Sequence, residues 1–141
     1  MRTLHEQTGK KIILVGTLDE RPVAETLAAK FPGIAGIVCG DLVLSETAVL
    51  VANASLVVAN DSAIMHLGFE LGTPTVGIFG PTDHRKYGHE GPKFRIAHGN
   101  AETCSCGSDQ LPRAERSCFH GLTPEKVIEL SLELLNEHQT A

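Results

Sequence analysis

A chain of 141 residues, 42% of them hydrophobic, has the size and composition of one globular domain. Seventeen acidic residues outnumber twelve basic ones, and the formal net charge of −5 argues against a nucleic-acid-binding surface, which requires a basic face. Aromatic residues make up only 4% of the chain, so the core must be built mainly from aliphatic residues, as is typical of helices packed on a buried parallel sheet.

No apolar run reaches the about 20 residues that a membrane-spanning helix requires. The longest candidate, residues 48–59, is interrupted by Asn53 and Ser55. The N-terminal residues also lack the apolar core of a signal peptide. We therefore expect a cytoplasmic protein with reduced thiols.

Short β-branched runs alternate with helical patterns along most of the chain. Ser45 is the expected N-cap of the second helix, and Gly72 is expected just after the end of the third. Strict alternation predicts a parallel sheet with right-handed crossovers, that is, an α/β, Rossmann-like three-layer domain over residues 1–141 with an irregular segment at 98–122. The expected strands are 11–15, 37–39, 56–59, 75–79 and 94–97, and the expected helices are 19–30, 46–53, 62–71 and 123–137.

Polar residues follow two of the predicted strands. Asp61, Ser62 and His66 come after the strand 56–59, and Gly80 and Thr82 come after the strand 75–79. In open α/β sheets, phosphorylated ligands bind in the crevice at the carboxyl ends of the strands. The sequence therefore predicts a site for a nucleotide or a nucleotide sugar. The dinucleotide fingerprint G-x-G-x-x-G is absent, so a standard NAD site is not expected.

A diphosphate suits the start of the helix 62–71, where the first N–H groups have no intrahelical partner and carry the positive end of the helix dipole. Ser62 would donate a further hydrogen bond, and His66 lies one turn later on the same face. Gly80 would let the ligand approach the backbone, and Thr82 offers a hydroxyl. The alternative is that Asp61 or Ser62 only caps the helix, that His66 is a core histidine, and that Gly80 to Thr82 form an ordinary turn.

Potential metal ligands gather in the irregular segment. Four residues of the types that zinc prefers lie within seventeen positions: Cys104, Cys106, Cys118 and His120. The C-x-C spacing is tighter than that of most structural zinc sites, so we favour ordinary thiols and expect neither a metal nor another cofactor. Cys39, within an apolar run, is expected in the core. Residues 83–86 are interpreted as a solvated loop, with an acceptor or phosphate contact as the alternative.

Residues 60–67, 71–76 and 79–83 together resemble the C-terminal half of the family 9 glycosyltransferases, the ADP-heptose:lipopolysaccharide heptosyltransferases. The resemblance runs from about Lys11 to Leu135. Residues 44–46, residues 85–88 and the cysteine cluster before the last helix also match. The resemblance implies a GT-B enzyme with two Rossmann-like domains facing each other across a cleft, of which the C-terminal one binds the nucleotide-sugar donor.

The resemblance also implies roles for single residues. Asp61 would contact the heptose hydroxyls, and Ser62, Ala63 and His66 would line the diphosphate. Glu20 would accept hydrogen bonds from the ribose hydroxyls, and Leu42 or Val43 would flank the adenine. A solvated first-turn glutamate is the alternative for Glu20. The family usually has glycine in place of Ala63, whose methyl group narrows the approach of a phosphate.

The activity implied is inverting transfer of heptose from ADP-heptose to a lipopolysaccharide core acceptor without a metal. The family's acceptor site and its general base lie upstream of these motifs, so no catalytic residue is assigned here, and we expect the chain to bind the donor without transferring it. The alternatives are a non-catalytic nucleotide-binding module, or part of a UDP-sugar transferase or epimerase. The sequence leaves open the acceptor, a homodimer, and peripheral membrane association of the full enzyme.

Overall fold

The computed structural model describes residues 1–89, 91–99 and 119–138. The chain divides into two compact units, Met1–Val49 and Leu50–Ala141. Within the described residues, two strands pair in the first unit and three in the second, and all pairs are parallel. The predicted α/β class with parallel pairing is confirmed, although the strands form two sheets where one was expected. A single domain over residues 1–141 stays a prediction.

The first unit has two parallel strands with helices around them. Strands β1 and β2 pair with Leu14 opposite Ile37, and α2 packs against β2. The sequence pattern does not predict α1. Gly9 follows the end of this helix, where a φ of 66° suits a residue without a Cβ atom. The elements are α1 (Arg2–Thr8), β1 (Ile12–Leu14), the 3-10 turn η1 (Leu18–Glu20), α2 (Arg21–Ala29) and β2 (Ala35–Ile37).

Strand β2 begins and ends two residues earlier than the predicted strand 37–39. The backbone N–H of Val38 still donates to the carbonyl of Leu14 at 3.0 Å, but Gly40, with a φ of 75°, then turns the chain away. Cys39 is 2% exposed, which confirms the prediction of a core residue, and burial raises the pKa of its thiol.

Helix α3 (Leu44–Ala52) spans the boundary between the two units. Ser45, the predicted N-cap, lies within the helix, so this prediction is wrong. The carboxylate of Glu46 instead accepts a hydrogen bond from the backbone N–H of Val43 at 3.0 Å. The hydroxyl of Thr47 donates to the carbonyl of Val43 at 3.1 Å. The helix therefore begins one residue before Ser45.

The second unit contains a parallel sheet in the order β3-β4-β5. Each of its strands agrees with the predicted range to within one residue. Its elements are β3 (Val57–Asn60), α4 (Ala63–Glu70), β4 (Thr75–Phe79), α5 (His84–Tyr87), β5 (Phe94–His98) and α6 (Pro124–His138).

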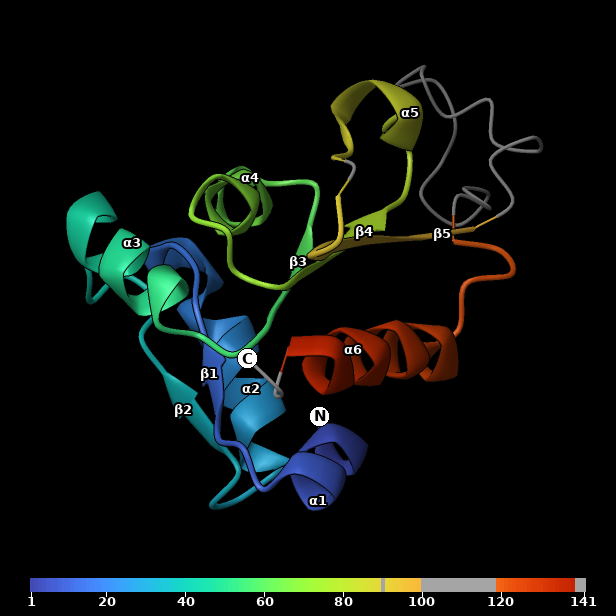
Figure 1. Cartoon of the computed structure of the whole chain (residues 1–141). Helices are drawn as coiled ribbons and strands as arrows, with labels where there is room; N and C mark the ends of the chain where they lie inside the picture. The colour runs from blue at the N-terminus through green and yellow to red at the C-terminus, as the bar shows by residue number, and fades with distance from the viewer. Residues whose placement is uncertain (90, 100–118, 139–141) are drawn as a thin grey trace. The chain divides into compact units, whose positions relative to one another are not determined.

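Helices cover both faces of this sheet. Helix α4 packs against β3 and β4, and α6 packs on the other side against β4 and β5 (Figure 1). On β4, Val76 joins a core cluster with Leu130 and Leu134 of α6, whereas Phe79 joins one with Met65 of α4 and with Phe94. Successive strand residues point to opposite faces, so β4, which is covered on both sides, has buried side chains on both faces. The second unit thus has the predicted three layers.

Helix α4 lies close to the sheet because small residues occupy the contact. A Cβ atom at Gly68 would fall 2.5 Å from the Thr75 hydroxyl, and one at Gly77 would fall 2.7 Å from the sulfur of Met65. Met65 and Gly68 are the buried residues of α4, while Leu71, just after its end, is 42% exposed. The helix is therefore buried on one face, although its sequence is apolar nearly all round and predicts burial on several sides.

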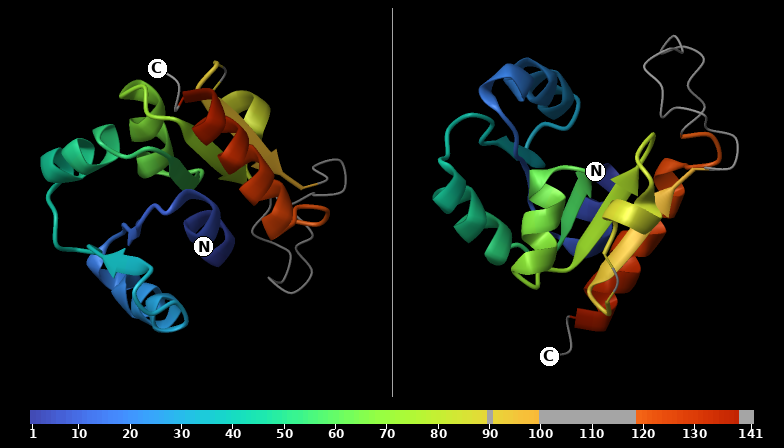
Figure 2. Two further views of the ribbon diagram at one scale, coloured as in Figure 1. Left: turned by 60° about the horizontal axis from the view of Figure 1, so that its bottom comes forward. Right: turned by 90° about the horizontal axis from the view of Figure 1, so that it is seen from above.

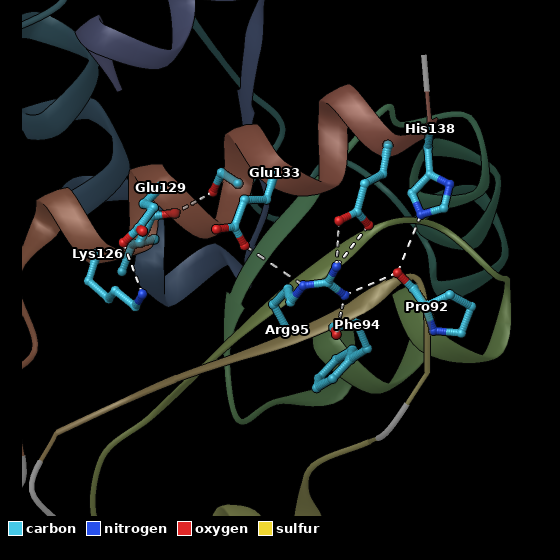
Figure 3. A network of polar contacts seen from close by, with 10 residues as sticks. Pro92, Phe94, Arg95, Lys126, Glu129, Glu133 and His138 are labelled. Carbon is cyan, nitrogen blue, oxygen red and sulfur yellow. Dashed lines mark hydrogen bonds and ion pairs between the residues drawn. The ribbon is translucent and has the colours of Figure 1, made fainter. Parts of the chain in front are cut away.

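Helix α6 runs alongside β5 (Figure 2) and is tied to it by polar contacts. Arg95 of β5 donates to both carboxylate oxygens of Glu137, at 2.9 and 2.7 Å, and its Nε lies 4.0 Å from Glu133 (Figure 3). Glu133 and Glu137 are one helical turn apart, so one guanidinium reaches both. Such partly exposed pairs contribute about 0–1 kcal/mol each, so they orient α6 while burial of its leucines holds it.

Helix α5 replaces the loop that was predicted at residues 83–86. Asp83 is its N-cap, accepting from the backbone N–H of Arg85 at 3.0 Å. The Arg85 side chain donates to the same carboxylate and lowers the pKa of Asp83. Of the predicted irregular segment 98–122, residues 100–118 lie outside the described residues. None of the described helices is long and apolar enough to cross a membrane.

The substitution Gly68→Ala tests the close packing of α4. Alanine improves helix propensity by about 1 kcal/mol, but the new methyl group must displace the buried Thr75 hydroxyl, at an overpacking cost of about 1–3 kcal/mol. We expect a net loss of up to about 2 kcal/mol in the free energy of unfolding, measured by chemical denaturation. The control is Gly36→Ala, where the nearest atom lies 4.0 Å from the new Cβ. A Gly68→Ala protein that is more stable than the parent would contradict this packing.

Candidate functional site

Asp61 lies where the ladder between β3 and β4 ends. Asn60 stands opposite Ile78, and the backbone N–H of Asp61 donates to the carbonyl of Ile78 at 3.1 Å, one step beyond the strand. The carboxyl ends of the two strands therefore share one edge of the sheet. Asp61 follows the first of these ends directly, and Gly80 follows the second.

The start of α4 is exposed next to Asp61. Ser62 occupies the N-cap position with extended backbone, but its hydroxyl makes no capping hydrogen bond within the described part of the chain. Its carbonyl accepts from the backbone N–H of His66 at 3.2 Å. Ser62 and Ala63 are both exposed. The positive end of the helix dipole thus reaches the surface beside a hydroxyl that does not cap it.

His66 turns toward Asp61. Its Nε2 lies 3.5 Å from the carboxylate Oδ1 of Asp61, and the side chains of His66 and Asp61 are 43% and 18% exposed. The alternative that His66 is a core histidine is therefore wrong. The two residues form a polar pair at the start of the helix.

His89 is the second partner of His66, and no local pattern in the sequence predicts it. Nε2 of His89 lies 2.8 Å from Nδ1 of His66. The His89 ring stacks on Phe69, with centroids 3.8 Å apart and planes 12° apart, and meets the edge of Phe94 at 5.3 Å. Burial lowers the pKa of His89, and the charge of His66 adds to this effect. The one available signal is that four of the seven histidines fall between residues 66 and 98.

A second histidine pair lies in the same unit. His84 of α5 and His98, the last residue of β5, stack with centroids 4.0 Å apart and planes 12° apart. Burial lowers the pKa of His84, and His98 contributes in the same direction. Nδ1–H of His98 donates to the carbonyl of Gly99 at 2.7 Å.

Gly80 has an aromatic neighbour from its own chain. A Cβ atom at this position would fall 2.5 Å from Cζ of Phe119. The close approach to the backbone that the sequence predicts for a ligand is thus taken by the Phe119 ring, which is itself 53% exposed. Thr82 is exposed.

The residues predicted to contact the nucleoside of the donor belong to the first unit. Oε2 of Glu20 accepts from the backbone N–H of Thr17 at 2.8 Å and from its hydroxyl at 3.0 Å. The first of these bonds is the Glu20 half of a capping box, and both bonds lower the pKa of Glu20. Glu20 is exposed and Leu42 half-buried, while Val43 is 63% exposed. Glu20 thus lies where the alternative of a solvated first-turn glutamate places it. Its contact with the ribose of a donor stays a prediction.

Within residues 1–89, 91–99 and 119–138, no group of three or more His, Cys, Asp or Glu side chains could hold a metal ion. Cys104, Cys106 and Cys118 lie outside these ranges, so the zinc alternative is not tested. His120, the fourth residue of that cluster, is exposed.

A parallel sheet covered on both faces, with polar side chains at the carboxyl ends of its strands, defines a Rossmann-like unit. The chain matches the description "Glycosyltransferase family 9 (heptosyltransferase)" over residues 2–119. It belongs to this family.

Similar proteins include heptosyltransferases of several bacteria. The chain is 32% identical over 126 residues to Lipopolysaccharide heptosyltransferase 1 of Pseudomonas aeruginosa, covering 79% of this chain and 35% of that protein. It is 34% identical over 93 residues to Lipooligosaccharide heptosyltransferase 2 of Campylobacter jejuni, covering 62% of this chain and 28% of that protein. The chain thus spans about a third of the length of these curated relatives.

Solved structures show the same fold. The structure of E. coli ADP-heptose lps heptosyltransferase II matches with a TM-score of 0.76 and 20% identity, covering 97% of this chain and 40% of that chain. The glycosyl transferase family 9 protein of Veillonella parvula also matches with a TM-score of 0.76, covering 96% of this chain and 41% of that chain. At this identity the likeness shows the fold alone.

The substitution Thr17→Val tests how the hydrogen bonds from Thr17 set the pKa of Glu20. It removes the Thr17 hydroxyl and keeps the backbone N–H. We expect the pKa of Glu20 to rise toward its ordinary value and to stay below it, because the larger contribution comes from the backbone N–H. A carboxyl with a lowered pKa stabilises the fold above its ordinary pKa, and this stabilisation is lost as the pH falls through the folded value.

The measurement is an NMR titration of the Glu20 carboxyl carbon. Thr26→Val is the matched control, because the Thr26 hydroxyl donates to the carbonyl of Pro22 and not to Glu20. An unchanged Glu20 titration in Thr17→Val would mean that the hydroxyl makes no contribution.

Proposed function

We propose that this chain is the donor-binding half of a heptosyltransferase that transfers heptose from ADP-heptose to a lipopolysaccharide core sugar. One observation carries the proposal. The Asp61–His66 pair lies at the exposed start of α4, where the adjacent parallel strands β3 and β4 end. Family membership and the names of the relatives support the same reading.

The diphosphate would bind at the start of α4. Its first N–H groups carry the positive end of the helix dipole, and the exposed Ser62 hydroxyl adds a donor. The half-exposed His66 can add a hydrogen bond or, when protonated, a charge. These groups would stabilise the negative charge that develops on the leaving ADP without a metal. The methyl group of Ala63 limits how closely a phosphate oxygen approaches.

The sugar and the nucleoside would be held by carboxylates. A carboxylate is an acceptor for vicinal hydroxyls, so Asp61 would take the heptose. In the first unit, Glu20 would take the ribose by exchanging its bonds to Thr17, and Leu42 would flank the adenine.

The catalytic base would lie outside these residues. Inverting transfer needs a base within hydrogen-bond reach of the acceptor hydroxyl, and the proposal gives Asp61 a binding role instead. The chain alone would therefore bind the donor without transferring heptose. Acceptor binding, dimerisation and membrane association belong to the whole enzyme in this proposal.

Two variants separate the proposed contacts. Asp61→Asn removes the charge and should weaken ADP-heptose binding by about tenfold or more, because a charge-assisted hydrogen bond is worth about 1.5–3 kcal/mol. It should weaken ADP binding less than ADP-heptose binding, since ADP has no heptose. His66→Ala should weaken both ligands. Affinities are measured by isothermal titration calorimetry on the 141-residue chain.

The control for these variants is His138→Ala, which removes a histidine whose ring contacts the carbonyl of Pro92 at 3.4 Å. Circular dichroism checks that each variant folds. If Asp61→Asn and His66→Ala both bind ADP-heptose as the parent does, the site lies elsewhere.

The preference of the chain for one nucleotide base tests whether the donor is an ADP sugar. Thermal shift with ADP, UDP and GDP should show stabilisation by ADP above the other two, because binding to the folded state alone raises stability in proportion to RT ln(1 + [L]/Kd). Stabilisation by UDP and not by ADP would favour a UDP-sugar enzyme and contradict the proposal.

A further inference from the structure

We propose that His89 is a positioning residue of the donor site, which holds His66 in the ring orientation and tautomer that present Nε2 to Asp61 and the diphosphate. The inference rests on the proposed function in one respect, namely that His66 contacts the donor. His89 itself touches neither ligand nor reacting atoms in this proposal.

Both ring nitrogens of His66 have a partner. Nδ1 lies 2.8 Å from Nε2 of His89, and Nε2 lies 3.5 Å from the Asp61 carboxylate. One contact alone would let the ring turn about its Cβ–Cγ bond. Two contacts on opposite sides of the ring define its plane, which matters because the His66 side chain is 43% exposed and has little packing to hold it.

His89 is well placed to act as the fixed partner. Its ring lies flat on Phe69 of α4 and meets the edge of Phe94 of β5, while these two phenyl rings meet edge to face at 5.9 Å. Phe69 is on the same helix as His66, three residues later. The two aromatic rings therefore tie His89 to the helix that carries His66 and to the sheet beneath it.

The hydrogen bond between the rings selects a tautomer. The Asp61 carboxylate favours a proton on the facing Nε2 of His66. Nδ1 of neutral His66 is then an acceptor, so Nε2 of His89 must donate. If His66 takes up a second proton as the diphosphate binds, its Nδ1–H donates and His89 accepts through Nε2, carrying its own proton on Nδ1.

One positive charge at most is expected on the pair. Burial lowers the pKa of His89, and a charge on His66 lowers it further, while Glu70 acts in the opposite direction. Among the described residues, the charged groups that act on the pair are Asp61 on His66 and Glu70 on His89. Of the two rings, His66 is the one that faces Asp61 at the start of α4.

Two substitutions separate the hydrogen bond from the packing. His89→Phe keeps a ring for Phe69 and Phe94 but removes the nitrogen. His89→Gln removes the ring but can place its amide nitrogen where Nε2 stood. A positioning role predicts that His89→Gln retains the behaviour of the parent and His89→Phe does not, whereas a packing role predicts the reverse.

The first measurement needs no ligand. Nitrogen-15 NMR of the imidazole groups reports which His66 nitrogen carries the proton. We expect the parent and His89→Gln to show the proton on Nε2, and His89→Phe to show a mixture of tautomers. His138→Phe serves as the matched control and should leave the His66 signals unchanged.

The second measurement is ADP affinity between pH 5.5 and 8.5, by titration calorimetry of the full 141-residue chain. We expect His89→Phe to bind roughly 3- to 10-fold more weakly at neutral pH, the cost of one hydrogen bond, and to shift the pH midpoint of binding. His89→Gln should follow the parent curve. The inference is overturned if His89→Phe matches the parent in both measurements, or if His89→Gln loses as much affinity as His89→Phe.

Failure of this inference differs from failure of the proposed function. A parent chain that does not bind ADP overturns the proposed function, and the His66 nitrogen signals still decide whether His89 orients His66. A parent that binds ADP through His66, with no response to His89→Phe, overturns the inference alone.

Discussion

Parallel pairing of β3 with β4 requires the chain to cross back over the sheet between them, and α4 is that crossover. The helix can lie against the strands because Gly68 leaves room for the buried Thr75 hydroxyl. The same pairing brings the ends of both strands to one edge, directly before the start of α4. Asp61 and Ser62 are placed by this arrangement, since Asp61 directly follows β3 and Ser62 is the N-cap of α4.

A few groups determine the electrostatic potential at the edge of the sheet where β3 and β4 end. The helix start supplies partial positive charge, Asp61 supplies one negative charge, and His66 lies between them with a proton that it can gain or lose. His89, whose pKa is lowered by burial, contacts Nδ1 of the His66 ring. Under the proposed function, these groups would hold a ligand that is anionic at one end and rich in hydroxyls at the other, such as a nucleotide sugar.

Local patterns predicted the second unit to within one residue at each strand, because β-branched runs and the glycine after α4 are signals of the chain itself. They failed where side chains compete locally. Glu46 reaches back to the N–H of Val43 and moves the start of α3 ahead of Ser45. Asp83 caps a short helix that looked like a solvated loop. In both cases a hydrogen bond from a backbone N–H to a carboxylate sets where the helix begins. Such a bond cannot be recognised from the periodicity of apolar residues in the sequence.

By itself, the sequence determined the parallel α/β class, the strands, and the motif of Asp61, Ser62 and His66, because these depend on neighbours within a few positions. Only the tertiary structure joined His89 to His66, twenty-three residues away, and set Phe119 beside Gly80. The physical reason is the same for both contacts. Contacts between segments depend on how the sheet and its helices pack, and packing brings together residues whose positions along the chain are unrelated.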